Sequence, residues 1–298
     1  MTRPVPDPAP ADDPRVVAFR HLLAVTDALR DPDGGCPWDL EQTTRSMAPY
    51  VVEEAHELVE AIEDGGPQPP GGDADSTSAR EAGDVLTSLL MVCRIAQDEG
   101  SFDAGDAARA ASDKLVRRHP HVFANGGSRT PDEVLETWEE IKRAERAADG
   151  EDTSALAGIP RALPALQRAG RTCQKAVAAG FHWKVARGAL AKLEEELDEL
   201  REALPEDALA RDARPSLEGA TRAAVEHELG DVLMAAAFLG GYLSLDPEGL
   251  CRSALRRFES RFRHMEAALG GTLAGRSLDE MMAAWRGAKE SEAAGGTA

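Results

Sequence analysis

Closely spaced carboxylates are the residues of this sequence best suited to chemistry. EEAHE at 53–57 places glutamates three and four residues apart, and EAGD at 81–84 places a Glu and an Asp three residues apart. Residues at these spacings lie on one side of an α-helix. If the two helices pack antiparallel, their carboxylates meet in one cleft, where like charges repel unless a cation compensates them. Mg²⁺ is the natural candidate, because this hard cation takes oxygen ligands and binds sites that also hold phosphate.

The acidic motif occurs a second time. EELDE at 195–199 matches EEAHE, and ELGD at 228–231 matches EAGD. Each copy is followed by the same pattern of basic and Trp residues, so chance is a poor explanation, although a duplication could equally copy a solvated structural face. The repeat predicts two acidic clusters: Glu53, Glu54, Glu57, Glu81 and Asp84 in the first, and Glu195, Glu196, Glu199, Glu228 and Asp231 in the second.

Basic residues follow each acidic cluster at helical spacing. Lys114, Arg117 and Arg118 follow the first, and Arg257 and Arg261 follow the second. In a chain with 53 acidic and 34 basic residues, such clustering indicates an anion site. Carboxylates that hold Mg²⁺, opposite cations that hold phosphate oxygens, form the general apparatus for phosphoryl or nucleotidyl transfer. The alternative is that these bases are only salt-bridge partners of the surplus acids.

Helices must position these residues, because apolar residues recur with the helical period between the acidic motifs and beyond them. No stretch shows sustained period-two alternation, and only 4% of the residues are aromatic, which disfavours sheets. The predicted fold class is all-α. The periodicity predicts helices over 51–62, 82–96, 104–118, 132–146, 189–203, 222–243, 247–269 and 278–290.

The repeat spans nearly the whole chain and predicts tandem duplicated, four-helix-bundle-like modules. Trp38 and Trp183 precede the acidic helices, whereas Trp138 and Trp285 close the two units. Polar segments at 64–79 and 203–221 are expected as loops between the acidic helices. We expect a disordered tail at 1–14, an N-terminal module at 15–146, a linker at 147–160, a C-terminal module at 161–290 and a frayed tail at 291–298.

Charge and composition exclude several other classes of protein. A formal net charge of −19 disfavours binding to DNA, RNA or an anionic membrane surface. No apolar run approaches the roughly 18 residues of a membrane span, and the N-terminus lacks the apolar core of a signal peptide. The four cysteines lie far apart without a CxxC pair, which is typical of reduced thiols in a cytoplasmic protein.

Other catalytic chemistries have weaker signals. His119 and His121 flank Pro120, which breaks the local helix and denies them the spacing of a helical metal site. Glu53 and His56 form a Glu-x-x-His pair of the di-iron type, but the second unit has no equivalent and such a site needs two. A di-iron bundle therefore stays a minor alternative, which would be recognised by its iron content and visible absorption.

At these motifs the sequence resembles the MazG family of all-α nucleoside triphosphate pyrophosphohydrolases. The first unit carries GCPWDLEQT at 35–43, PYVVEEAHELVEAIE at 49–63, REAGDVL at 80–86 and DKLVRRHPHVF at 113–123. The second unit, with AGFHW, EELDEL, HELGDVL and RRFESRFRHME, looks like the second module of the two-module members. Together the matches cover about residues 30–145 and 160–290.

The resemblance implies a helical bundle that pairs with itself as a homodimer. It also implies Mg²⁺-dependent hydrolysis of NTPs or dNTPs to a nucleoside monophosphate and pyrophosphate, which clears the nucleotide pool, with Mn²⁺ as the alternative ion. The implied metal ligands are Glu54, Glu57, Glu81 and Asp84, and Glu196, Glu199, Glu228 and Asp231, with Glu53 and Glu195 as bases or water-orienting groups. The implied substrate contacts are Trp38, Lys114, Arg118, Trp138, Trp183, Arg257, Arg261 and Trp285.

Three positions depart from the family pattern. Thr44 stands where members usually have His, Ala82 where they have Leu, and Arg257 where they have Lys. None of these changes removes a metal ligand, although Arg257 replaces a point donor with a planar fork. A non-catalytic helical protein that senses nucleotides or acts as a scaffold is the alternative from another class. Retention of every acid in both units favours the enzyme.

Overall fold

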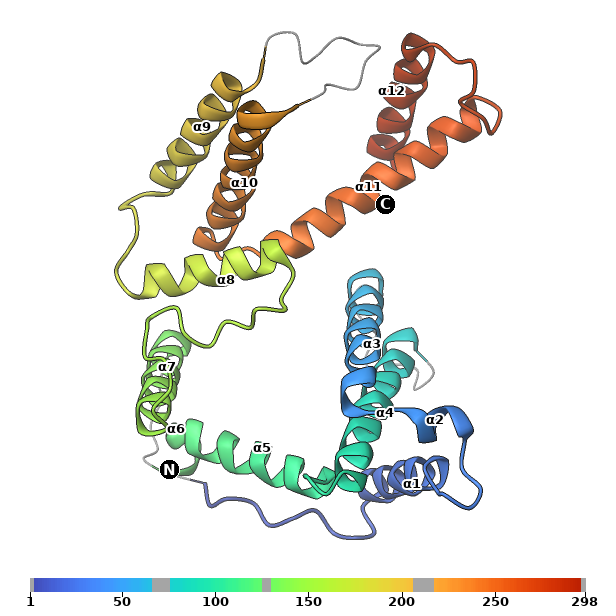
Figure 1. The fold of residues 1–298 in the computed structure, drawn as a ribbon, viewed down its shortest axis with the longest axis vertical. Coiled ribbons are helices and arrows are strands. Elements are labelled where there is room, and N and C mark those ends of the chain that lie inside the picture. Colours follow the sequence, from blue (N-terminus) through green and yellow to red (C-terminus); the bar gives the residue numbers. More distant parts are fainter. Residues whose placement is uncertain (1–2, 66–75, 125–129, 206–216, 296–298) are drawn as a thin grey trace. The chain divides into compact units, whose positions relative to one another are not determined.

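The computed structural model describes residues 3–65, 76–124, 130–205 and 217–295 (Figure 1), and in these ranges it contains helices and no strand. The all-α prediction is confirmed. The chain divides into two compact units, Met1–Glu145 and Arg146–Ala298. The boundary falls within the last turns of a helix, and the predicted linker at 147–160 stays a prediction.

The first unit is built around two long helices that carry the first acidic cluster. α3 packs along α4, and α1 also packs on α4. Met47, Met91 and Ile95 form the buried core of this unit, against which Leu29 and Val92 pack. The helices of this unit are α1 (Pro14–Leu29), α2 (Pro37–Glu41), α3 (Thr44–Asp64), α4 (Thr77–Asp98), α5 (Ala104–Arg118), α6 (Pro120–Phe123) and α7 (Pro131–Ala148).

Polar caps fix where the helices of the first unit begin. The Thr43 hydroxyl accepts from the Ser46 N–H at the start of α3, and the Ser46 hydroxyl accepts from the Thr43 N–H in return. Ser76 caps α4 through the N–H of Ala79. Such caps satisfy amide groups that a helix start leaves unpaired, and they set the residue from which the helical period is counted. The acidic residues of α3 and α4 therefore have a defined phase.

A buried arginine ties the short helix α2 to this framework. Arg30, at the end of α1, is 7% exposed. Its Nε donates to Asp98 at 2.7 Å, and its Nη1 donates to the carbonyls of Asp39 and Gln42. A buried guanidinium needs such partners, because leaving its donors unpaired would be costly. Arg30 thus fixes α2, which carries Trp38, to the ends of α1 and α4.

The second unit repeats the arrangement with fewer helices in its described part. α10 packs against both α9 and α8, and α12 packs along α11 (Figure 1). α8 and α10 cross closely, because a Cβ at Gly241 would lie 2.7 Å from the carbonyl oxygen of Gly170. The helices of this unit are α8 (Ala165–Ala178), α9 (Ala186–Ala203), α10 (Gly219–Tyr242), α11 (Pro247–Ala268) and α12 (Leu278–Gly295).

All eight helices expected from periodicity are present, with longer bounds in most cases. α1, α2, α6 and α8 are additional, and Pro120 begins α6 after α5 has ended at Arg118. α12 continues to Gly295, into the segment that was expected to fray, and α4 starts at Thr77, inside the expected loop at 64–79. Most of that loop, and most of the polar stretch at 203–221, lies outside the described residues.

Within the described ranges, no single helix has the length and hydropathy needed to cross a membrane. α10 and α11 meet the criterion only when taken together, and they are bent by 110° at their junction.

Candidate metal centres

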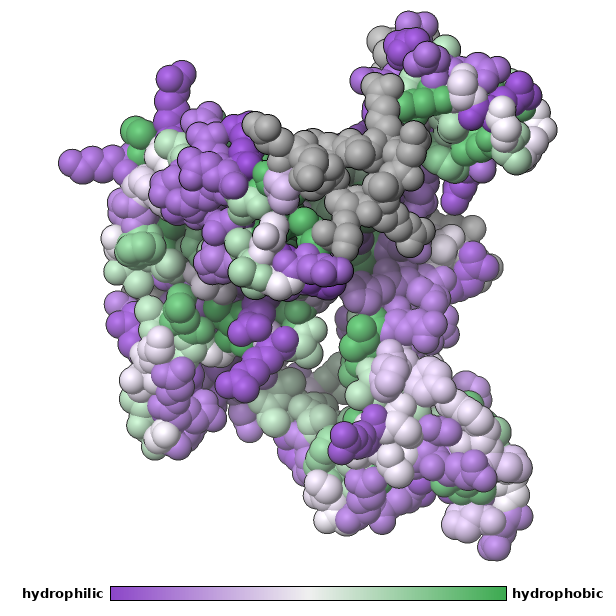
Figure 2. Space-filling model, turned by 45° about the horizontal axis from the view of Figure 1, so that its top comes forward, coloured by the Kyte–Doolittle hydropathy of each residue, from purple (hydrophilic) through white to green (hydrophobic). Residues whose placement is uncertain are grey.

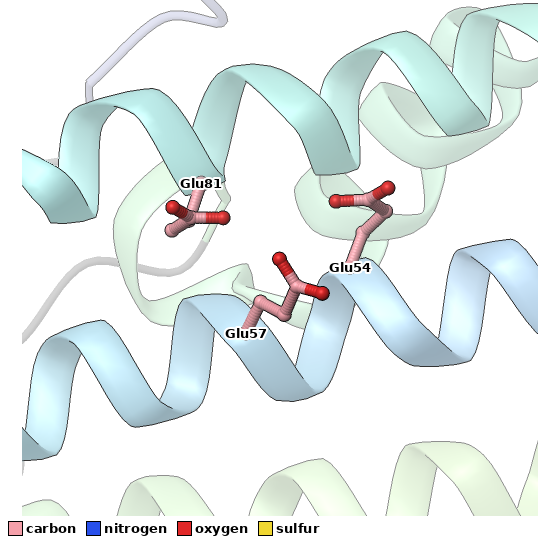
Figure 3. Close-up of side chains that lie close together, drawn as sticks. All are labelled: Glu54, Glu57 and Glu81. Carbon is pink, nitrogen blue, oxygen red and sulfur yellow. The ribbon is translucent and has the colours of Figure 1, made fainter.

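Three carboxylates meet between α3 and α4 in the first unit. Glu54 and Glu57 extend from α3 toward Glu81 on α4 (Figure 3). One oxygen from each of the three lies within 4.8 Å of the others. The helical spacing places the two α3 glutamates one turn apart, so that packing of α4 brings the third carboxylate to the same point. The structure thus brings together three of the five acidic residues that the sequence assigned to the first cluster.

The first cluster has no compensating base in the described part of the chain, where none of its three carboxylates forms an ion pair. The pKa of Glu54 is raised, first by partial desolvation and then by the negative charges of Glu57, Asp84, Glu53 and Glu81. Like charges at short range disfavour ionisation unless a cation joins them. An all-oxygen, anionic donor set of this kind fits a hard divalent ion such as Mg²⁺ or Mn²⁺.

The second unit forms the equivalent cluster between α9 and α10. One oxygen each from Glu196, Glu228 and Asp231 lies within 4.8 Å of the others, and Glu196 is only 6% exposed. Here basic groups accompany the acids. Lys192 Nζ lies 2.8 Å from Glu196 and 2.9 Å from Glu195, and His227 Nε2 lies 3.5 Å from Asp231.

These basic neighbours change the electrostatics of the second cluster. The hydrogen bond from Lys192 lowers the pKa of Glu196, in contrast to the raised pKa of its counterpart Glu54. The pKa of Glu199 is raised, first by desolvation and next by the negative charge of Glu196. The second centre therefore has the same donor chemistry as the first but is already partly neutralised.

Six of the eight carboxylates predicted as metal ligands belong to the two compact sets. Asp84 and Glu199 are exposed and lie outside them, although the charge of Asp84 still acts on Glu54. Glu53 is exposed beside the first set, and Glu195 is paired with Lys192. The roles assigned to these four residues, and the ligand roles of the six in the compact sets, stay predictions.

The residues predicted to bind phosphate differ in whether they already form an ion pair within the protein. Arg118 lies 2.6 Å from Glu145 of α7, and its guanidinium carbon is 5.6 Å from the centre of the Trp138 ring. Lys114, one turn earlier on α5, is exposed and has no partner within the described ranges. Sequence reasoning placed Lys114 and Arg118 in one anion site but did not identify Glu145.

In the second unit, too, one of the two basic residues forms an ion pair and the other does not among the residues described. Arg261 lies 2.5 Å from Glu292 of α12, whereas Arg257 donates only to the hydroxyl of Ser253, at 2.8 Å, among the residues described. Trp285 packs with its ring centre 5.2 Å from that of Phe258. The motif that could have revealed Glu145 and Glu292 is present in the sequence, since each follows its unit's last Trp by seven residues.

The two early tryptophans have different surroundings. Trp38 is 48% exposed and meets Tyr50 edge-on, with ring centres 5.5 Å apart. Tyr50 lies one turn before Glu54 on α3, so this aromatic pair borders the first acidic cluster. Trp183 is half-buried, and its carbonyl accepts from the hydroxyl of Tyr242 at 2.6 Å. Sequence reasoning did not single out Tyr50.

Comparison with known proteins places the chain in a family. Residues 42–123 match the model of the MazG nucleotide pyrophosphohydrolase domain. The chain is 39% identical over 275 residues to a nucleoside triphosphate pyrophosphohydrolase of Escherichia coli K12, covering 91% of this chain and 97% of the relative. It is 36% identical over 250 residues to the nucleoside triphosphate pyrophosphohydrolase/pyrophosphatase MazG of Thermotoga maritima, covering 84% and 86%. With matches of this extent, the chain belongs to the MazG family.

Proposed function

We propose that this protein hydrolyses nucleoside triphosphates, ribo- or deoxyribo-, to a nucleoside monophosphate and pyrophosphate in a reaction that requires Mg²⁺. The observation that carries the proposal is the meeting of Glu54, Glu57 and Glu81 from two helices within 4.8 Å, repeated in the second unit. The names of the relatives add support, because both the Escherichia coli and the Thermotoga maritima proteins are called nucleoside triphosphate pyrophosphohydrolases.

The acidic clusters are the proposed metal sites. Glu54, Glu57 and Glu81 hold the ion in the first unit, and Glu196, Glu228 and Asp231 hold it in the second. Asp84 and Glu199 complete the two sets by the family resemblance. Mg²⁺, or Mn²⁺ in its place, supplies charge stabilisation for the phosphate oxygens and the leaving pyrophosphate.

The chain's own residues perform the remaining steps. Glu53, or Glu195 in the second unit, orients a water and accepts its proton. The water oxygen forms a bond to the α-phosphorus, and the bond from that phosphorus to the oxygen bridging to the β-phosphate breaks. Lys114 and Arg118, or Arg257 and Arg261, bind the negatively charged phosphate oxygens. Holding the water and the phosphates in this geometry makes the attack effectively unimolecular, which lowers its activation barrier.

Aromatic side chains provide a non-selective surface for the base. Trp38 and Tyr50 are exposed beside the first cluster, and Trp138, Trp183 and Trp285 are the other proposed contacts. Stacking accepts any base because every base has a π-face. We therefore infer broad nucleotide specificity and a role in clearing non-standard or excess nucleotides from the cytoplasm.

A second copy of this chain is the proposed partner, as a homodimer. Leu86 and Leu89 on α4 are exposed, and so are Leu229 and Leu233 on α10. The surface in Figure 2 shows apolar side chains (green) among the hydrophilic ones. Exposed apolar residues at helical spacing on one acidic-cluster helix of each unit favour pairing with an equally apolar helix face. Sedimentation equilibrium tests this pairing, with Leu86→Glu combined with Leu233→Glu expected to shift the protein to monomer.

A substrate panel tests the activity. Purified full-length protein is incubated with the common NTPs and dNTPs and Mg²⁺, and pyrophosphate and nucleoside monophosphate are quantified. The variant that combines Glu57→Gln with Glu228→Gln should lose turnover while keeping its helical circular dichroism. A nucleotide-sensing scaffold would instead bind NTP without turnover in the wild type, and that result would replace the enzyme with the non-catalytic alternative.

A further inference from the structure

The last helix of each unit is tied to the preceding basic helix by an equivalent ion pair. Arg118 of α5 pairs with Glu145 of α7 at 2.6 Å, and Arg261 of α11 pairs with Glu292 of α12 at 2.5 Å. Each of these glutamates follows the last tryptophan of its unit by seven residues, two turns further along the same helix face. The pairing occurs in both copies of the repeat, so it is a feature of the module.

Glu145 accepts hydrogen bonds through both of its carboxylate oxygens. Oε2 accepts from Nε and Nη2 of Arg118 at 3.0 and 2.6 Å, and Oε1 accepts from Nε of Arg117 at 2.5 Å. The hydrogen bonds from Arg118 and then Arg117 lower the pKa of Glu145 to about 2, so it stays ionised at neutral pH. The side chains of Arg118 and Glu145 are each 19% exposed, so the pair is well shielded from water.

Each arginine has at least one guanidinium nitrogen that takes no part in the ion pair. Nη1 of Arg118 makes no hydrogen bond to the residues described, and the same holds for Nη1 and Nη2 of Arg261, of which only Nε donates to Glu292. A guanidinium is a rigid planar fork, so fixing one edge fixes the direction of the other nitrogens. Glu145 holds two nitrogens of Arg118 and so sets where the third points, whereas Glu292 anchors Arg261 through Nε alone.

The same contact also sets the place of an aromatic ring. The guanidinium carbon of Arg118 lies 5.6 Å from the centre of the Trp138 ring, within the range of a cation–π contact. In the second unit, Trp285 packs on Phe258, one turn before Arg261 on α11. The basic helix and the tryptophan helix are thus held in register by the ion pair and the ring contact together.

We propose that Glu145 and Glu292 are positioning residues, which orient Arg118 and Arg261 so that their free guanidinium nitrogens bind a phosphate chain. The inference deepens the proposed function and depends on it for the identity of the substrate. An arginine held in place loses less side-chain freedom when an anion binds, so the affinity for the anion rises. Neither glutamate touches the substrate in this account.

Binding of inorganic pyrophosphate tests the inference without relying on turnover. Isothermal titration calorimetry with Mg²⁺ compares the wild type with the variant that combines Glu145→Gln and Glu292→Gln. We expect binding weaker by about tenfold, because loss of the ionised acceptor frees both arginines. The matched control combines Glu140→Gln and Glu290→Gln, which are exposed on the same two helices, and it should bind like the wild type. Should the Gln pair not fold, Glu145→Asp with Glu292→Asp, which keeps the charge but shifts its position, carries the same expectation.

A charge swap separates positioning from simple helix attachment. Compared with the double Gln variant, the variant that combines Glu145→Gln with Arg261→Glu and Glu292→Arg regains an ion pair between α11 and α12, now reversed, with the cation on α12. We expect the melting temperature to recover and pyrophosphate affinity to stay low. Recovery of affinity in the swap, wild-type affinity in the Gln variants, or no pyrophosphate binding by the wild type would each overturn the inference. A wild type that binds pyrophosphate but releases none from any NTP would reject the proposed activity and leave this inference standing.

Discussion

Lys192 Nζ lies 2.8 Å from the carboxylate of Glu196 in the second acidic cluster, whereas Tyr50 stands at the matching position of the first. The two clusters share their donor chemistry but differ in their compensating charge. This difference explains why the pKa of Glu196 is lowered while that of Glu54 is raised. An ion that enters the second cluster must compete with the ammonium group, and one that enters the first need not.

Replacing Lys192 by an uncharged residue should raise the metal affinity of the second cluster. Lys192→Gln removes the competing cation, so the second cluster should bind Mn²⁺ several-fold more tightly, since a nearby unit charge changes such affinities on the order of tenfold. Electron paramagnetic resonance of free Mn²⁺ measures this in the Glu57→Ala background, in which we expect the first site to bind no ion. Tyr50→Lys, tested in the Asp231→Ala background, is the reciprocal control and should weaken the first site. Unchanged affinity in both variants would contradict the competition.

Metal binding should stabilise the folded protein. If, as proposed, Mg²⁺ binds the assembled cluster and not the dispersed acids of the unfolded chain, a hundredfold excess over Kd adds about 2.7 kcal/mol per site to the free energy of unfolding. Thermal melting in MgCl₂ should exceed melting in NaCl of equal ionic strength. Equal stabilisation by both salts would indicate screening of the −19 charge alone.

Removal of single ligands should abolish metal binding without unfolding the unit. Glu57→Ala or Asp84→Ala deletes an acid from a crowded group and relieves like-charge repulsion, so the helix content should not fall. Circular dichroism and Mn²⁺ binding on the same samples check this. A loss of helical signal in either variant would assign these acids a structural role.

Single and paired substitutions compare how much each unit contributes to turnover. Among the residues described, the acidic cluster of the first unit has no compensating base and Lys114 has no partner, so we expect Asp84→Ala to cost more activity than Asp231→Ala and the combination to abolish it. Turnover per chain is measured for the three variants. If Asp231→Ala eliminates activity and Asp84→Ala leaves it unchanged, the first unit is structural or regulatory.

The ion pair of Arg118 and Glu145 predicts a specific response to acid. The pKa of Glu145 is about 2 in the folded state, below its ordinary value of 4.5, so its stabilising contribution is complete above about pH 4.5. It is lost as the pH falls from there toward 2, because the unfolded chain takes up the proton first. The difference in urea midpoint between the wild type and Glu145→Gln should be constant from pH 7 to 5.5 and shrink below 4.5. A difference that shrinks above pH 5.5 would show that other groups dominate.

Much of the fold and of the site was predictable from the sequence because it depends on helical spacing. Residues three and four apart share a face, so the meeting of Glu54 and Glu57 with Glu81 followed from the motif and the packing of two helices. The pairing of Arg118 with Glu145 did not follow, since it joins residues 27 apart on separate helices whose crossing no local pattern specifies. Helix α2 was also missed, because five residues are too few for a periodic signal.

The fate of the oxygen from water shows which phosphorus the water attacks. Wild-type protein turns over a nucleoside triphosphate with Mg²⁺ in ¹⁸O-enriched water, and mass spectrometry locates the label in the products. Attack at the α-phosphorus predicts ¹⁸O in the nucleoside monophosphate, unlabelled pyrophosphate and no orthophosphate. Label in the pyrophosphate would contradict attack at the α-phosphorus, and release of orthophosphate with a nucleoside diphosphate would contradict the bond that is proposed to break.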